Sequence, residues 1–125
     1  MNIELNQEAI EALDRDAIEQ MTNAARELVF ARQHGNDESE FEQTILACAE
    51  VHGALHWSKL GNDTAPVAVE FSERAQTWLA RERKDVADYM ADLDAGVNEP
   101  DQERVSWAAL LLHTLDRIVG QPVAA

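Results

Sequence analysis

Residues 7–34 read QEAIEALDRDAIEQMTNAARELVFARQH. Apolar residues recur in this stretch at steps of three and four, the spacing that keeps one face of an α-helix apolar. The stripe consists of Ile10, Leu13, Ala17, Met21, Ala24, Leu28 and Ala31. Asn6 precedes the stretch, and an asparagine side chain at that position caps a helix N-terminus. The stretch therefore predicts one long amphipathic helix over residues 7–34.

The rest of the chain repeats this pattern. Glycines follow the stretches of helix formers, and Pro66 and Pro100 fall near the starts of the third and fourth stretches. Asp63 or Thr64 is the expected cap of the third stretch. The predicted helices span 7–34, 39–60, 65–95 and 100–119, and we see no strand pattern. Because the connections are short, we expect an all-α, antiparallel (up-down-up-down) four-helix bundle forming a single domain over residues 1–125.

The third and fourth stretches differ in their apolar pattern. The third has a stripe that weakens around Glu82; it comprises Val67, Phe71, Ala75, Trp78, Val86, Tyr89 and Leu93. The fourth is apolar on nearly all sides between Val105 and Leu112. A helix that is apolar all round is either central in its own domain or buried against another chain. The second interpretation predicts partner contacts at Trp107 and Leu111.

The charge balance restricts the partners. The chain carries 24 acidic and 10 basic residues, a formal charge of -14. This charge repels phosphate backbones and anionic membranes, and it favours basic partners. Acidic side chains form rows at helical spacing, which lowers helix stability; these are Glu4, Glu8 and Glu11, then Glu38 and Glu42, then Asp85, Asp88 and Asp92. The rows predict either a phosphate-like array that binds a basic partner or a face kept acidic for solubility.

One cluster of residue types suggests chemistry. Cys48, His52 and His56 follow each other at four-residue steps, and His113 with Asp116 could face them from the fourth helix. Thiolate and imidazole ligands would suit zinc. The alternative is an ordinary buried cysteine with histidines packed beside it. A Cys48–His52 nucleophile and base pair is a further alternative. No phosphate-binding loop or His-Glu-x-x-His motif is present, so we predict no enzyme and no cofactor.

These observations predict a function class. Cys48 is the single cysteine, no secretion signal is recognisable, and the longest apolar run is Trp107 to Leu112, so we expect a cytoplasmic protein without a membrane span. The leading hypothesis is a non-catalytic acidic interaction module of the inhibitor, immunity or adaptor type, which binds a basic protein surface; nucleic-acid mimicry is one version of this hypothesis. The alternatives are a metal- or small-ligand-binding bundle and a homodimer or larger homo-oligomer assembled through the fourth helix.

Overall fold

The computed structural model describes residues 2–59, 67–94 and 102–119. Its elements in chain order are β1 (Asn2–Leu5), α1 (Gln7–Gln33), α2 (Ser39–Lys59), β2 (Val67–Glu70), α3 (Glu73–Asp94) and α4 (Gln102–Val119). The predicted all-helical class is confirmed, with four helices among the described residues. The bounds of α1, the start of α2 and the end of α4 agree with the prediction within one residue. Several predicted boundaries lie outside the described residues. They are the ends of the second and third helices at 60 and 95, the starts of the third and fourth helices at 65 and 100, and the caps Asp63 and Thr64.

Helices α1 and α2 form an antiparallel hairpin. The Asn6 side chain accepts a hydrogen bond from Ala9 N at 2.8 Å, so it caps α1 as predicted. After the last turn of α1, Gly35 takes a left-handed φ of 67°, and Asn36 N donates to Ala31 O at 2.8 Å. Glycine adopts that conformation at no steric cost and so ends the helix there.

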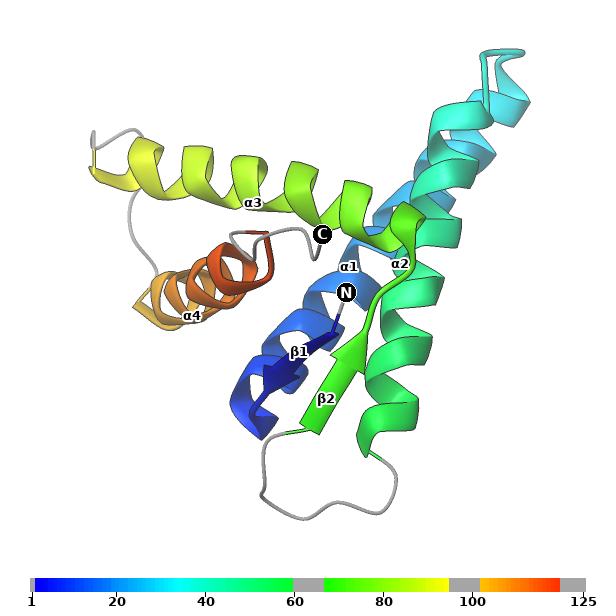
Figure 1. Ribbon diagram of the computed structural model, residues 1–125. Helices are drawn as coiled ribbons and strands as arrows, with labels where there is room; N and C mark the ends of the chain where they lie inside the picture. Colours follow the sequence, from blue (N-terminus) through cyan, green and yellow to red (C-terminus); the bar gives the residue numbers. More distant parts are fainter. Residues whose placement is uncertain (1, 60–66, 95–101, 120–125) are drawn as a thin grey trace.

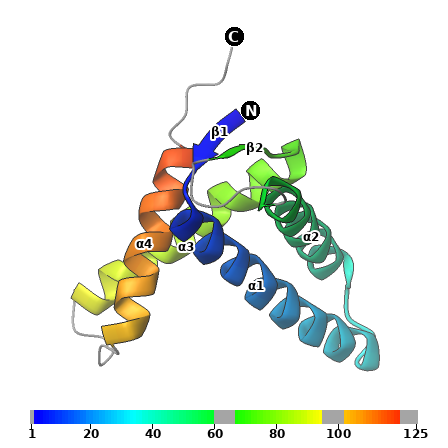
Figure 2. The ribbon, with the colours of Figure 1, turned by 90° about the horizontal axis from the view of Figure 1, so that it is seen from below.

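Ion pairs connect α3 to its two neighbouring helices, α2 and α4. Glu50 pairs with Arg74 and Glu40 with Arg81, so two ion pairs join α2 to α3 where these helices cross. Arg83 pairs with Asp116 and Arg104 stacks on Tyr89, so α3 and α4 are antiparallel. The α3–α4 hairpin lies across the α1–α2 hairpin at a wide angle, and the tip of the α1–α2 hairpin projects beyond it (Figures 1 and 2).

The predicted start of the third helix is wrong, because Val67–Glu70 form a strand. β2 pairs antiparallel with β1, with Ile3 opposite Val69 and Leu5 opposite Val67. Val69 is buried between the exposed Ala68 and Glu70, which is the alternation of a strand with one covered face. Helix α3 begins only at Glu73, where Ser72 Oγ accepts from Ala75 N at 3.2 Å. The stripe residue Val67 therefore belongs to the sheet.

The core lies where the two hairpins cross, and the small sheet covers one end of it (Figure 1). Its largest fully buried apolar side chains are Leu5, Ile10, Leu13, Val51, Leu55, Val69, Leu79, Leu111, Leu115 and Ile118. Two carboxylic acids, Asp16 and Glu82, are buried with them. None of the helices in the described ranges is long and apolar enough to cross a membrane.

Candidate functional site

Cys48 lies in the core and not on a reactive surface. Its side chain is fully buried on α2. Burial, followed by the charges of the neighbouring Glu82 and Asp16, raises the pKa of the thiol to about 12. The nucleophile and the zinc ligand are both the thiolate form of cysteine. At neutral pH this thiol is therefore protonated, which removes support from the nucleophile hypothesis.

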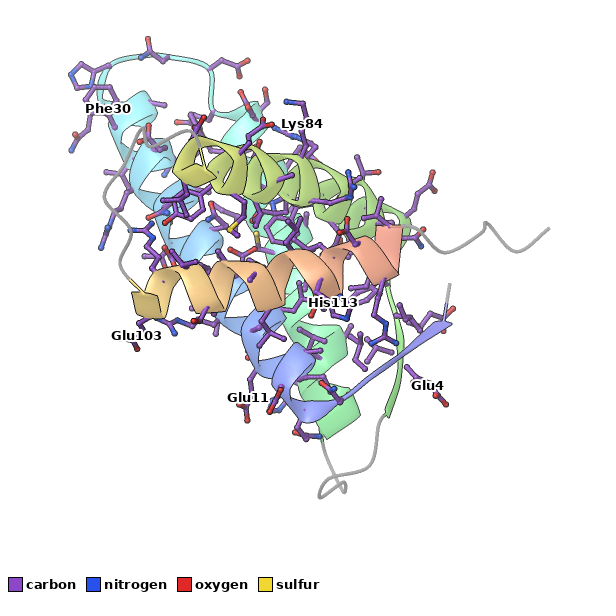
Figure 3. All side chains as sticks on the ribbon, turned by 90° about the vertical axis from the view of Figure 1, so that its left-hand side faces the viewer. Glu4, Glu11, Phe30, Lys84, Glu103 and His113 are labelled. Carbon is purple, nitrogen blue, oxygen red and sulfur yellow. The ribbon has the colours of Figure 1, made fainter. Side chains whose placement is uncertain are left out.

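The histidines point to different neighbours. His52 Nδ1 lies 2.5 Å from Asp14 Oδ1, so this ring joins α2 to α1. The His56 ring stacks on His52 with centroids 6.1 Å apart. His113 is exposed on α4 (Figure 3). Across 2–59, 67–94 and 102–119, no three His, Cys, Asp or Glu side chains are grouped so that they could hold a metal ion. The structure thus does not bring Cys48 and the three histidines together as a set of ligands.

We predict that Cys48 resists thiol reagents in the folded protein. With a pKa near 12, its labelling by iodoacetamide at pH 8 should be at least about 100-fold slower than that of an unperturbed cysteine of pKa ~8.5. The same protein unfolded in urea provides the control, because Cys48 is the single cysteine and should then react at the ordinary rate. Equal labelling of the folded and unfolded forms would show that Cys48 is accessible as thiolate.

The acidic rows are exposed except for the partly buried Glu38, and they do not all have the predicted helical form. Glu8 and Glu11 lie on the outer face of α1, whereas Glu4 belongs to β1, beyond the Asn6 cap. Glu4 and Glu11 both project outward from the molecule (Figure 3). Glu38 precedes α2 and pairs with Arg32 at 2.9 Å, while Glu42 is exposed. On α3, Asp85 and Asp92 are exposed and Asp88 pairs with Lys84. The rows therefore lie on separate elements.

Most positive charges are engaged within the chain. Five form ion pairs with carboxylates of the same chain, namely Arg32, Arg74, Arg81, Arg83 and Lys84. Arg15 lies over the Trp107 ring, Arg104 lies over Tyr89, and Arg117 donates to Glu4 O. In the described part of the chain, we find no ion pair to Glu8, Glu11, Glu42, Asp85 or Asp92. The surface thus keeps a large uncompensated negative charge.

The two apolar residues predicted at a partner surface have different environments. Leu111 is fully buried in the core of this chain, so its side chain does not lie on the surface where the predicted partner contact would place it. Trp107 is only partly buried, and Arg15 lies 5.4 Å from the ring centroid. Its Nε1 is buried and has no acceptor among the described residues. Trp107 therefore remains a candidate for a partner contact.

Trp107 separates two shallow hollows between α1 and α4. One has a volume of about 260 Å³ and is lined by Arg15, Glu19, Glu103, Arg104 and Trp107. The other has a volume of about 280 Å³ and is lined by Glu8, Glu11, Ala12, Arg15, Trp107 and Leu110. Both share Arg15 and Trp107, so they form one continuous surface, which we call the α1–α4 groove. Figure 3 shows Glu103 at the start of α4 and Glu11 on α1.

The buried carboxyl pair, Asp16 of α1 and Glu82 of α3, is a feature that the sequence analysis missed. The two side chains are hydrogen-bonded to each other, and Gln20 also bonds Asp16. Burial, followed by the bond to Asp16 and the charge of Asp16, raises the pKa of Glu82 to about 9. Burial raises the pKa of Asp16 too. Glu82 is therefore protonated at neutral pH, and the net charge is closer to -13 than to the formal -14.

A signal for this pair was present in the sequence. Asp16 falls three residues after Leu13, and Glu82 falls three after Leu79, so each stands on the apolar face of its helix. The weakening of the third stripe at Glu82 marked this position. A charged residue on a core face predicts burial, although its partner on another helix cannot be read from local spacing.

Comparisons of the chain with protein-family models, curated proteins and solved structures found no match.

Proposed function

We propose that this chain is a non-catalytic acidic interaction module that binds a basic surface of a partner protein. The observation that carries the proposal is the distribution of charge: most of the described positive side chains are engaged within the chain, and acidic ones face solvent on α1, α2 and α3. Such a surface attracts basic partners and speeds their association.

The inhibitor, immunity and adaptor roles are versions of this proposal, as is the imitation of a phosphate array. Carboxylates fixed on helices present negative charge at regular spacing, as a nucleic-acid backbone does. The free thiol of Cys48 supports a cytoplasmic setting, because cysteines stay unpaired in a reducing compartment. The protonated thiol favours binding over thiol-based catalysis in this proposal.

Affinity capture from an extract of the host tests the proposal. The full-length protein should retain a specific partner with a basic surface at 0.1 M salt and release it at 1 M salt. The reason is that the screening length falls from about 10 Å to about 3 Å over this range. Glu8→Gln/Glu11→Gln/Glu42→Gln should retain much less of that partner.

The control keeps the charge at the same positions. Glu8→Asp/Glu11→Asp/Glu42→Asp preserves all three carboxylates, so its capture should match the wild type within about twofold. Partner retention that is equal for both triple variants and unchanged at 1 M salt would contradict the proposal.

A further inference from the structure

The backbone of the small sheet shows which groups remain for another chain. Ile3 and Val69 are opposite each other in the β1–β2 ladder, and both are buried. Buried backbone N–H and C=O groups are paired in native proteins, and no turn or cap in the described residues bonds these two, so they bond each other. Because hydrogen-bonded and non-hydrogen-bonded pairs alternate along an antiparallel ladder, the backbone groups of Glu4, Ala68 and Glu70 point away from it.

The two edges of the sheet differ in how they are covered. At the β1 edge, Arg117 Nη2 of α4 donates to Glu4 O at 3.0 Å, which agrees with the outward direction of that carbonyl. At the β2 edge, Ala68 and Glu70 are exposed, and we find no hydrogen bond to their outward backbone groups from the part of the chain that the structure describes. An exposed strand edge with unpaired N–H and C=O groups is a template for a further strand.

We infer that the β2 edge binds an extended segment of the partner protein as a third strand of the sheet, and that this segment alternates basic and apolar side chains. The inference rests on the proposed function and adds to it the place of binding, the conformation of the bound segment and its side-chain pattern. In strand addition, main-chain hydrogen bonds supply affinity and alternate side chains supply specificity.

The outer face of the sheet sets the charge of the bound segment. Glu4, Ala68 and Glu70 are exposed on this face, and the Glu4 side chain projects outward in Figure 3. Neither carboxylate forms an ion pair with a described residue. The basic residue nearest to β2 in the sequence, Arg74, pairs instead with Glu50 of α2. A lysine or arginine opposite Glu70 would therefore meet an uncompensated carboxylate, and opposite charges across a strand pair stabilise it.

The inner face of the sheet sets the apolar position. Side chains alternate between the two faces of a strand, so the residue opposite Val69 would point towards the core, as Val69 does. Figures 1 and 2 show α1 and α2 on this face, with β2 on the side of α2. A third strand beside β2 would thus extend the sheet over α2, which would cover an apolar side chain there. The residue opposite the small Ala68 returns to the acidic outer face, so the expected pattern is basic, apolar, basic.

A second copy of this chain suits the edge less well. Two antiparallel copies of β2 would place Ala68, and not a basic side chain, opposite Glu70. The formal charge of each chain is -14, so two copies repel each other. A basic segment of another protein has neither disadvantage.

Three short synthetic peptides test the inference with the full-length protein. The parent peptide has a central Lys-Val-Lys, in which antiparallel pairing places the first lysine opposite Glu70 and the valine opposite Val69. N-methylation of the first lysine removes an N–H that faces β2, whereas N-methylation of the valine removes one that faces solvent. By isothermal titration, we expect the first change to weaken binding at least about tenfold and the second to leave it within about threefold.

Hydrogen exchange followed by ¹⁵N NMR locates the bound peptide. The parent peptide should protect the amides of Ala68 and Glu70 and leave that of Glu4, at the other edge, unchanged. Glu70→Gln should weaken the parent peptide about two- to fivefold, whereas Asp92→Asn, with the same loss of charge on α3, should leave its affinity within about 1.5-fold of the wild type. Ala68→Pro removes the outward N–H, and proline is tolerated where that group faces solvent, so it should keep the fold and lose at least about tenfold in affinity.

The outcomes separate the edge from the proposed function. Equal affinity of the two N-methylated peptides, or protection of Glu4 in place of Ala68 and Glu70, would overturn the β2 edge as the site and leave the proposed function standing. A dimer in sedimentation that Ala68→Pro abolishes would assign the edge to a second copy and overturn the inference in the same way. Failure of the parent peptide to bind also overturns it, and only together with salt-resistant capture of a partner does that failure overturn the proposed function.

Discussion

Replacing Glu82 with glutamine should stabilise the protein at pH 8 by roughly 2–4 kcal/mol. The pKa of Glu82 rises from an ordinary 4.5 to about 9 on folding, so the folded state binds a proton that the unfolded state releases in this range. The contribution of Glu82 to stability is therefore greatest below pH ~4.5 and falls towards pH ~9, by about 1.4 kcal/mol per unit at full slope. Glutamine imitates the protonated acid, because it is neutral and its N–H can donate to Asp16.

Urea unfolding followed by circular dichroism between pH 5 and pH 9 measures this effect. The wild type should lose stability steadily as the pH rises, and Glu82→Gln should lose much less. Asp92→Asn is the matched control: it removes a carboxylate from the exposed face of the same helix, so its stability should stay within about 0.5 kcal/mol of the wild type. If Glu82→Gln is less stable than the wild type at pH 8, the carboxyl pair does not bind the proton that we assign to it.

Truncating Leu111 to alanine should destabilise the protein by about 2–5 kcal/mol. Leu111 is fully buried among core residues of the same chain, so the substitution leaves a cavity in an already packed interior. Leu46→Ala is the control, since Leu46 is 44% exposed on α2, and it should cost less than about 1 kcal/mol.

The same measurement separates a core role from an interface role. In a monomer core, the loss caused by Leu111→Ala is independent of protein concentration, whereas an interface residue gives an effect that changes with concentration. We therefore expect equal midpoints of urea unfolding at low and high protein concentration for both the wild type and the variant. A midpoint that rises with concentration in the wild type and not in Leu111→Ala would restore α4 as a self-association surface.

The helices could be predicted from the sequence because their signals are local. The stripe from Ile10 to Ala31, the Asn6 cap and the left-handed Gly35 all act within a few residues, and α1 ends within one residue of its predicted end. The strand at Val67–Glu70 could not be predicted in the same way. Its four residues become a strand by pairing with Asn2–Leu5, which lies far away in the sequence.

The features of the candidate site also differ in whether local sequence signals could predict them. The exposure of Glu8, Glu11, Asp85 and Asp92 follows from helical spacing and was predicted. The groove was not, because it depends on α4 lying beside α1 so that Trp107 meets Arg15. The burial of Leu111 within this chain was not predicted, because an apolar face has the same sequence pattern whether its neighbours belong to this chain or to another.

The salt dependence of affinity for the captured partner tests the central claim most directly. Isothermal titration of the full-length protein with that partner between 0.1 M and 1 M salt should show the dissociation constant rising by at least about 100-fold, as expected for several charge pairs that salt screens. Glu8→Gln/Glu11→Gln/Glu19→Gln should bind more weakly at 0.1 M salt and show a shallower dependence. A dissociation constant that does not change with salt would contradict an acidic interaction module.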